Sequence, residues 1–295
     1  MMRRDVPATS PTRIMLWVLL ALFLAPIATG QADFSSSVSF GDSLTHNELI
    51  GFPFRIPLYG DDPMEAVFKK ARLSGNKLTN YAVAGSHAVH VLAQMGAYGI
   101  QVAANRQALA TMISYEIGGN DILDNDRKLG ASPPGRDPSA DKMINDLLKN
   151  IFEQLFLLYV YHPSAKFVIW TIPDITYTPK EWSKRNTTEG KNIRAHLNRI
   201  NMAIRSLELY PQVVVLDTEV IIRDLAMNPP LIHNRRLIGP PAKGDYDNMF
   251  ADEIHPTAVS NALLANFILD RMNARWKTTF PKYTENELAA LARIP

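Results

Sequence analysis

Apolar and polar positions along the chain form blocks that predict strands and helices in turn. Short, nearly uninterrupted apolar runs predict five strands, at residues 38–40, 78–83, 111–117, 167–172 and 213–216. Longer stretches with apolar residues at helical spacing predict helices at 63–73, 89–109, 140–161, 187–209 and 256–273, with a short one at 285–292. The Pro- and Gly-rich stretch 228–244 is predicted to be a loop.

This alternation predicts an α/β fold of the flavodoxin-like kind, with a five-stranded parallel sheet between two layers of helices. Strands that are apolar along their whole length fit a sheet that is covered on both faces. In such folds, ligands and reacting groups gather at the carboxyl ends of the strands. The polar residues that follow each predicted strand are therefore the first candidates for a site.

The first 32 residues have the pattern of a signal peptide. Arg3, Arg4 and Arg13 precede an apolar run at 14–25, and small residues follow it. That run is shorter than the roughly 20 residues of a membrane-spanning helix, although an uncleaved anchor stays the alternative. We therefore expect one mature domain at 33–295, secreted or periplasmic, with no stable membrane span after cleavage.

Composition narrows the classes of function. The leader holds three of the 31 Lys and Arg residues and one of the 29 Asp and Glu residues, so the remainder is nearly neutral. A neutral domain gives no reason to expect a nucleic-acid partner. The absence of cysteine from the sequence excludes thiol catalysis, thiolate metal sites and disulfides. No phosphate-binding loop is present in the sequence, and we expect no cofactor.

Four short motifs stand where predicted strands end or where the last long helix begins. They are Gly41-Asp42-Ser43-Leu44, the run 80–85 that ends in Ala84-Gly85, Gly118-Gly119-Asn120-Asp121, and Asp252-Glu253-Ile254-His255-Pro256. In content and order they resemble the four signature blocks of the GDSL/SGNH hydrolases, over about 220 residues. The resemblance implies a three-layer α/β/α fold and a serine ester hydrolase that acts on small-molecule, lipid or glycan esters.

The same resemblance assigns a role to each matching residue. Ser43 corresponds to the nucleophile, His255 to its general base and Asp252 to the acid of the triad. The backbone N–H groups of Ser43 and Gly85 and the side-chain amide of Asn120 correspond to the oxyanion hole. This set suits acyl transfer, because a serine hydroxyl needs a neighbouring base and the carbonyl oxygen that becomes negative needs hydrogen-bond donors.

Several residues near these motifs have competing interpretations. Glu253 and Asp217 are alternative triad acids, since both are carboxylates close to a predicted helix start or strand end. His46, His87 and His90 lie near the candidate site in sequence, but their spacing matches no known metal-binding pattern, so we expect rim positions and no metal. The aromatic stretch 52–59 could line an acyl pocket, cover it, or simply pack against the core.

Two other functions remain open from the sequence. Acyl transfer to an alcohol other than water would use the same residues as hydrolysis. A non-catalytic module that binds lipids or glycans could keep the fold, although loss of Ser43 or His255 would be its usual sign. There is no Gly-x-Ser-x-Gly sequence, so the nucleophile elbow of the α/β-hydrolases is not present in the chain.

Overall fold

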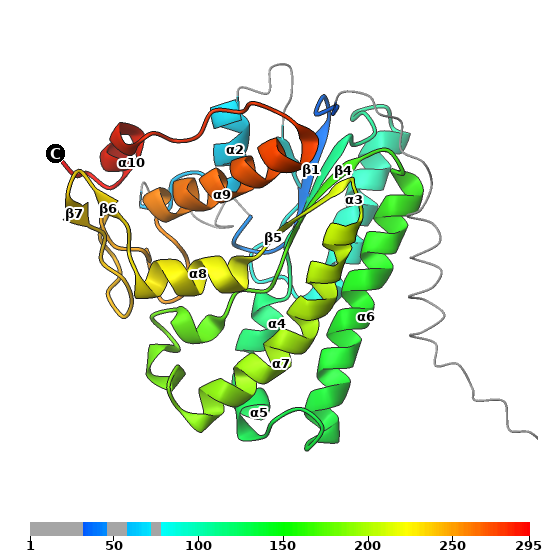
Figure 1. The fold of residues 1–295 in the computed structure, drawn as a ribbon. Helices are drawn as coiled ribbons and strands as arrows, with labels where there is room; N and C mark the ends of the chain where they lie inside the picture. The colour runs from blue at the N-terminus through cyan, green and yellow to red at the C-terminus, as the bar shows by residue number, and fades with distance from the viewer. Residues whose placement is uncertain (1–31, 46–57, 72–77) are drawn as a thin grey trace, which may run out of the picture. The chain divides into compact units, whose positions relative to one another are not determined.

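The computed structural model describes residues 32–45, 58–71 and 78–295, which centre on a sheet of five parallel strands (Figure 1). The strands are β1 (Ser37–Phe40), β2 (Leu78–Asn80), β3 (Met112–Tyr115), β4 (Lys166–Trp170) and β5 (Val213–Leu216). Their order across the sheet is β2-β1-β3-β4-β5, and every pair is parallel. The predicted α/β fold with a five-stranded parallel sheet is therefore confirmed.

The order of the strands determines where a ligand can approach. From β1 the chain goes first to β2 on one side of it and then to β3 on the other side. At such a reversal the two connections leave in opposite directions, which opens a crevice outside the carboxyl ends of the strands. The segments that follow β1, β2 and β3 meet at this edge, and these segments carry three of the four sequence motifs.

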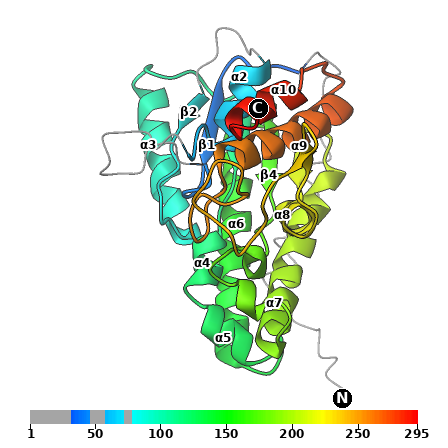
Figure 2. The same cartoon turned by 90° about the vertical axis from the view of Figure 1, so that its left-hand side faces the viewer.

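Helices cover both faces of the sheet. On one face lie α2 (Pro63–Ala71) and α9 (Ala258–Trp276), on the other α3 (Val91–Ala103), α6 (Pro138–Tyr161) and α7 (Thr188–Arg205) (Figures 1 and 2). Ile268, Leu269 and Met272 of α9 are fully buried and pack in one apolar cluster with Val168 and Val214 of the sheet. Burying each side chain of this size stabilises the folded state by about 1.5–3 kcal/mol, so these contacts hold α9 against the sheet.

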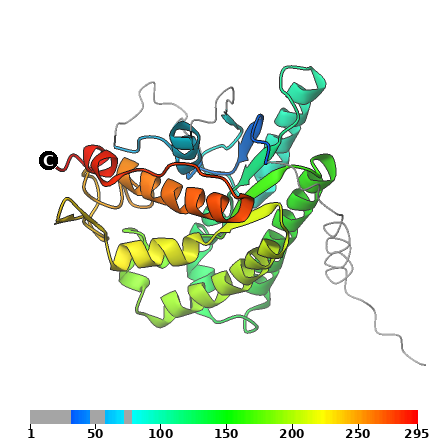
Figure 3. The same cartoon turned by 45° about the horizontal axis from the view of Figure 1, so that its top comes forward.

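Three helices were not anticipated from the sequence. They are α4 (Gly119–Leu123), α5 (Asp126–Ala131) and α8 (Thr218–Met227). The first two are short and rich in polar residues and glycine, so they lack the apolar periodicity that marks a long amphipathic helix. The stretch 228–244, predicted to be a loop, contains a small antiparallel hairpin of β6 (Leu231–Ile232) and β7 (Arg235–Arg236). The last helix, α10 (Glu285–Leu291), contacts this hairpin (Figure 3).

Some predicted elements end earlier in the structure. The second strand stops at Asn80, where the Asn80 side chain accepts a hydrogen bond from the N–H of Ala82 and bends the chain. The helix predicted at 89–109 ends at Ala103, two residues before Asn105 takes a left-handed conformation.

The described residues all belong to one compact unit, Gln31–Pro295. The predicted signal peptide lies outside the described residues except for Ala32. None of the helices in the described part of the chain combines the length and apolar character needed to cross a bilayer.

Candidate active site

Ser43 lies in a tight turn directly after β1. The N–H of Leu44 donates to Oδ1 of Asp42 at 3.0 Å, and the N–H of Thr45 donates to the Asp42 carbonyl at 3.3 Å. Gly41 is required just before the turn, because a Cβ there would lie 2.4 Å from the carbonyl oxygen of Glu116 and from Oγ1 of Thr45. The chain thus passes close to Glu116, just after β3, and then turns. Ser43 lies in this turn and is half-buried.

His255 reaches Ser43 from the other end of the sequence. In the segment before α9, Oδ1 of Asp252 accepts the backbone N–H groups of Ile254 and His255 at 2.8 and 2.7 Å. The other oxygen of Asp252 lies 2.7 Å from Nδ1 of His255, and Nε2 of His255 lies 2.8 Å from Oγ of Ser43. The structure therefore brings Ser43, His255 and Asp252 into one hydrogen-bonded chain.

The Asp252 carboxylate is held in its charged form. Burial raises its pKa, but the hydrogen bonds from the His255 ring and from two backbone N–H groups outweigh burial and leave the pKa well below the usual range. Tyr59 adds a further donor, because its hydroxyl lies 3.0 Å from Oδ2 of Asp252. Burial and this contact raise the pKa of Tyr59 to about 12. Tyr59 belongs to the aromatic stretch 52–59, whose first six residues lie outside the described residues.

Gly85 and Asn120 lie on the two segments that flank the Ser43 turn. Gly85 has a φ of +76°, a left-handed conformation that favours glycine, and a Cβ there would meet nothing within 4 Å. Within the described part of the chain, the backbone N–H groups of Ser43 and Gly85 donate to no other residue. Nδ2 of Asn120 donates to the Ser86 carbonyl at 3.0 Å and to Oδ2 of Asp42 at 3.3 Å.

Gln94 of α3 joins two of these segments and was not singled out from the sequence. Its side-chain oxygen accepts the N–H of Gly41 at 2.9 Å, while its Nε2 donates to the Gly41 carbonyl at 2.7 Å and to Oγ of Ser86 at 3.2 Å. A single buried amide thus fixes the spacing between the Ser43 turn and the Gly85 segment. Nothing local marks such a residue in a sequence, because Gln94 lies within an ordinary amphipathic helix.

A comparison with protein families shows to which family the chain belongs. The model of the GDSL-like lipase/acylhydrolase family matches residues 38–268, which include all four motifs. The chain belongs to this family. The comparison with curated proteins gives no match.

Solved structures show the same fold as this GDSL family member. Lip_vut3, a lipase from a goat rumen metagenome, has 15% identity and a TM-score of 0.55, covering 80% of this chain and 96% of that chain. Axe2, an acetylxylan esterase from Geobacillus stearothermophilus, has 15% identity and a TM-score of 0.51, covering 85% of this chain and 97% of that chain. The predicted GDSL/SGNH family and its fold are confirmed, whereas the role of each site residue stays a prediction.

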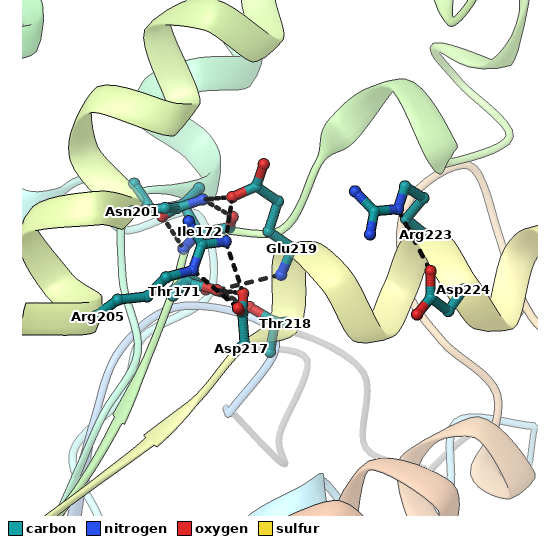
Figure 4. A network of polar contacts seen from close by, with 9 residues as sticks. All are labelled: Thr171, Ile172, Asn201, Arg205, Asp217, Thr218, Glu219, Arg223 and Asp224. Atoms are coloured by element: carbon teal, nitrogen blue, oxygen red, sulfur yellow. Dashed lines mark hydrogen bonds and ion pairs between the residues drawn. The ribbon is translucent and has the colours of Figure 1, made fainter. Parts of the chain in front are cut away.

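The two competing carboxylates of this GDSL family member are engaged elsewhere. Asp217, just after β5, accepts Nε and Nη2 of Arg205 at 2.8 and 2.9 Å, in a network that also includes Glu219, Asn201 and Thr171 (Figure 4). Glu253 forms an ion pair with Lys243 on the surface. Of the three candidate acids, Asp252 is the carboxylate that contacts His255.

The two described histidines next to the site, His87 and His90, are engaged by neighbouring residues. Nε2 of His87 lies 3.0 Å from Oδ2 of Asp124, and its Nδ1 lies 3.6 Å from Asp121. The N–H of His87 donates to Nδ1 of His90 at 2.9 Å. Among the described residues no group of three or more potential ligands could hold a metal ion. His46 lies outside the described residues.

A small apolar cavity is lined in part by sequence neighbours of Ser43 and His255. Its volume is about 40 Å³, and its lining includes Leu44, which follows Ser43, and Ile254 and Pro256, which flank His255. Trp170 of β4 and Ile222 of α8 line other parts of the wall. The cavity therefore lies between the residue that follows Ser43 and the carboxyl ends of β4 and β5.

Proposed function

We propose that the protein is a serine ester hydrolase that works through an acyl-Ser43 intermediate. The observation that carries this proposal is the chain of contacts from Ser43 Oγ to His255 Nε2 at 2.8 Å and from His255 Nδ1 to Asp252 at 2.7 Å. Both distances lie within the hydrogen-bond reach that a general base and its orienting carboxylate need. Membership of a family of ester hydrolases supports the same conclusion.

In the first half of the reaction, Ser43 Oγ attacks the ester carbonyl while His255 Nε2 accepts the serine proton. The resulting imidazolium is stabilised by Asp252, whose lowered pKa keeps it ionised. The negative charge on the carbonyl oxygen is met by the N–H groups of Ser43 and Gly85 and by the amide of Asn120. Collapse of the intermediate breaks the ester bond, and His255 gives its proton to the departing alcohol.

In the second half, water attacks the acyl-Ser43 ester in the same way. His255 takes a proton from water, the carbonyl oxygen again becomes negative, and collapse of this intermediate releases the carboxylic acid. The proton returns from His255 to Ser43 Oγ, so the residues are regenerated unchanged. The general-base step is typically worth about 10² to 10⁴ in rate.

The small volume of the apolar cavity favours substrates with a short acyl group. One water-sized group needs roughly 10–15 Å³ of such space, so a cavity of about 40 Å³ accommodates about three non-hydrogen atoms. Leu44, Ile254 and Pro256, which line the cavity, are the sequence neighbours of Ser43 and His255, and this supports the cavity as the acyl site. We therefore propose esters of acids of roughly two to four carbons as substrates.

The direct test is hydrolysis of nitrophenyl esters from acetyl to decanoyl by the purified protein, beside the Ser43→Ala variant. We expect turnover that is highest for the short acyl groups and is lost in Ser43→Ala. Equal turnover by the variant would contradict Ser43 as nucleophile. An optimum at long chains would contradict the short-acyl assignment alone.

We further propose that the protein is exported after removal of the leader. The charged start, the apolar run and the small residues of the first 32 positions support this. N-terminal sequencing of the protein recovered outside the cytoplasm tests it, and the expected first residue is close to Asp33. An intact leader on a membrane-bound protein would favour the anchor instead.

A further inference from the structure

Two carboxyl groups are buried together behind the Ser43 turn. Asp42, in the turn itself, and Glu116, one residue after β3, are each only 1% exposed. Their side chains are hydrogen-bonded to each other, and the N–H of Asp42 also donates to Oε2 of Glu116 at 3.4 Å. Two buried carboxylates in contact resist being ionised together, because burial disfavours each charge and the two like charges repel each other. The pair therefore holds a proton at neutral pH.

The geometry determines which of the two groups is the acceptor. Oδ1 of Asp42 accepts the N–H of Leu44 at 3.0 Å, and Oδ2 faces Nδ2 of Asn120 at 3.3 Å. Donors directed at both oxygens favour the charged form of Asp42. Among the described residues, the donor to the Glu116 carboxyl, besides the contact between the two carboxyl groups, is the more distant N–H of Asp42. Glu116 is thus the donor, and its proton lies between the two carboxyl groups.

The surrounding charges agree with this assignment. Burial raises the pKa of Asp42 to about 6, while the Leu44 N–H, Glu116 and His255 act in the opposite direction. Burial, followed by the charge of Asp42, raises the pKa of Glu116 well above its usual value. The other titratable neighbours that act on the pair are Asp121 of α4 and Tyr115 of β3, and neither is a cation. Glu116 therefore stays neutral where the proposed esterase would operate.

We propose that Glu116, as a neutral carboxylic acid, is a positioning residue for the oxyanion hole. It donates to Asp42, and Asp42 in turn holds both the Ser43 turn, through Leu44, and the amide of Asn120. This inference rests on the proposed ester hydrolysis at Ser43. The proton has a second effect, since it leaves one negative charge instead of two near the developing oxyanion.

Two substitutions of Glu116 separate a positioning role from a merely structural one. Glu116→Gln keeps the shape and a donor toward Asp42, so kcat should stay within about threefold of the wild type. Glu116→Met fills similar space without a donor. It should lower kcat about tenfold with little change in KM, which is less than the 10²- to 10³-fold cost of losing an oxyanion donor itself. Ser114→Ala, at a fully buried position in β3, is the matched control and should leave kcat unchanged.

An infrared measurement tests the proton independently of activity. In D₂O at neutral pH, the carbonyl stretch of a protonated carboxylic acid is separate from the carboxylate bands. We expect a stronger band of this kind in the wild type than in Glu116→Gln, because Asp62, whose pKa burial raises to about 7, contributes to the band in both proteins. A wild-type level of kcat in Glu116→Met, a Glu116→Gln variant as slow as Glu116→Met, or an unchanged carboxylic acid band in Glu116→Gln would overturn the inference. If Glu116→Met fails to fold, the infrared result and the kcat of Glu116→Gln still test the inference. Absence of esterase activity in the wild type would instead refute the proposed function.

Discussion

Nε2 of His255 lies 2.8 Å from Oγ of Ser43, although 212 positions separate the two residues in the sequence. The contact exists because β1 ends at the same edge of the sheet at which the segment before α9 passes. Each residue is fixed by its own local structure, Ser43 by the turn after β1 and His255 by the two backbone bonds that Asp252 accepts. Their geometry thus depends on the fold and not on a flexible loop between them.

Replacing Asp252 with Asn should lower kcat by about 10⁴, because an amide at this place favours the wrong tautomer of the imidazole. Asp217→Asn is the matched control, since it makes the same change at a carboxylate that the sequence left as an alternative triad acid. Asp217 contacts Arg205 and not His255, so its variant should keep kcat within about twofold. Steady-state kinetics on a short nitrophenyl ester measures both. A large loss in Asp217→Asn with little change in Asp252→Asn would reverse the assignment.

The same control variant should show a pH-dependent loss of stability. Burial alone would raise the pKa of Asp217, but the hydrogen bonds and charge of Arg205 lower it below its usual value. A lowered folded-state pKa adds stability above the unfolded-state value of about 4, and this stability is lost as pH falls through the folded-state value. Both side chains are about one third exposed, so solvent screening limits the effect at pH 7 to roughly 1 kcal/mol.

Urea unfolding of the wild type and Asp217→Asn, from pH 7 downward, measures this effect. The difference in free energy of unfolding should be largest at neutral pH and should shrink as the pH falls below about 4. A difference that stays constant over this range would show that Asp217 stabilises the fold by means other than its charge.

Removing the side-chain amide of Asn120 should affect turnover more than substrate binding. Asn120→Ala takes away one of three proposed oxyanion donors, which typically costs about 10² to 10³ in kcat. Asn125→Ala is a suitable control, because Asn125 lies just beyond α4 and its amide donates to the carbonyl of Asp121. We expect its kcat to stay near the wild-type value. Asn120→Ala with normal kcat and raised KM would make Asn120 a residue of substrate binding only.

The size of the apolar cavity should set the preferred acyl length. Ile222 of α8 lines this cavity, and Ile222→Ala should shift the optimum in kcat/KM toward longer acyl groups. The adjacent Ile221 lines a different pocket, so Ile221→Ala should keep the short-chain optimum. The measurement is kcat/KM across the nitrophenyl ester series. The same optimum in all three proteins would show that this cavity does not bind the acyl group.

Much of the fold could be predicted because its signals are local. The strand at 213–216 is apolar and β-branched throughout except for Leu216, and the structure has β5 at those residues. Residues that follow parallel strands share one edge of the sheet, so the sequence alone predicts that Ser43, Gly85 and Asn120 lie together. The family resemblance supplied the roles, which the structure's geometry supports without testing them.

Other parts depend on packing between distant segments. Whether Asp217 or Asp252 serves His255 could not be decided from sequence, since only the three-dimensional position of Arg205 shows that Asp217 is already engaged. Tyr59 and Gln94 likewise reach the site from segments with no motif of their own. Glu116 did leave a signal, a carboxylate within the apolar run 111–117, where a charged residue needs an explanation.

The central claim is that Ser43 carries the acyl group, and trapping that intermediate tests it most directly. The purified protein is mixed with nitrophenyl acetate, quenched in acid within the first turnover, digested and analysed by mass spectrometry. The account predicts one acetyl group on the peptide that contains Ser43, absent in Ser43→Ala. It also predicts that acetylation is strongly slowed in His255→Ala. Rapid turnover without an acetylated Ser43, or an acetyl group on another residue that persists in Ser43→Ala, would contradict it.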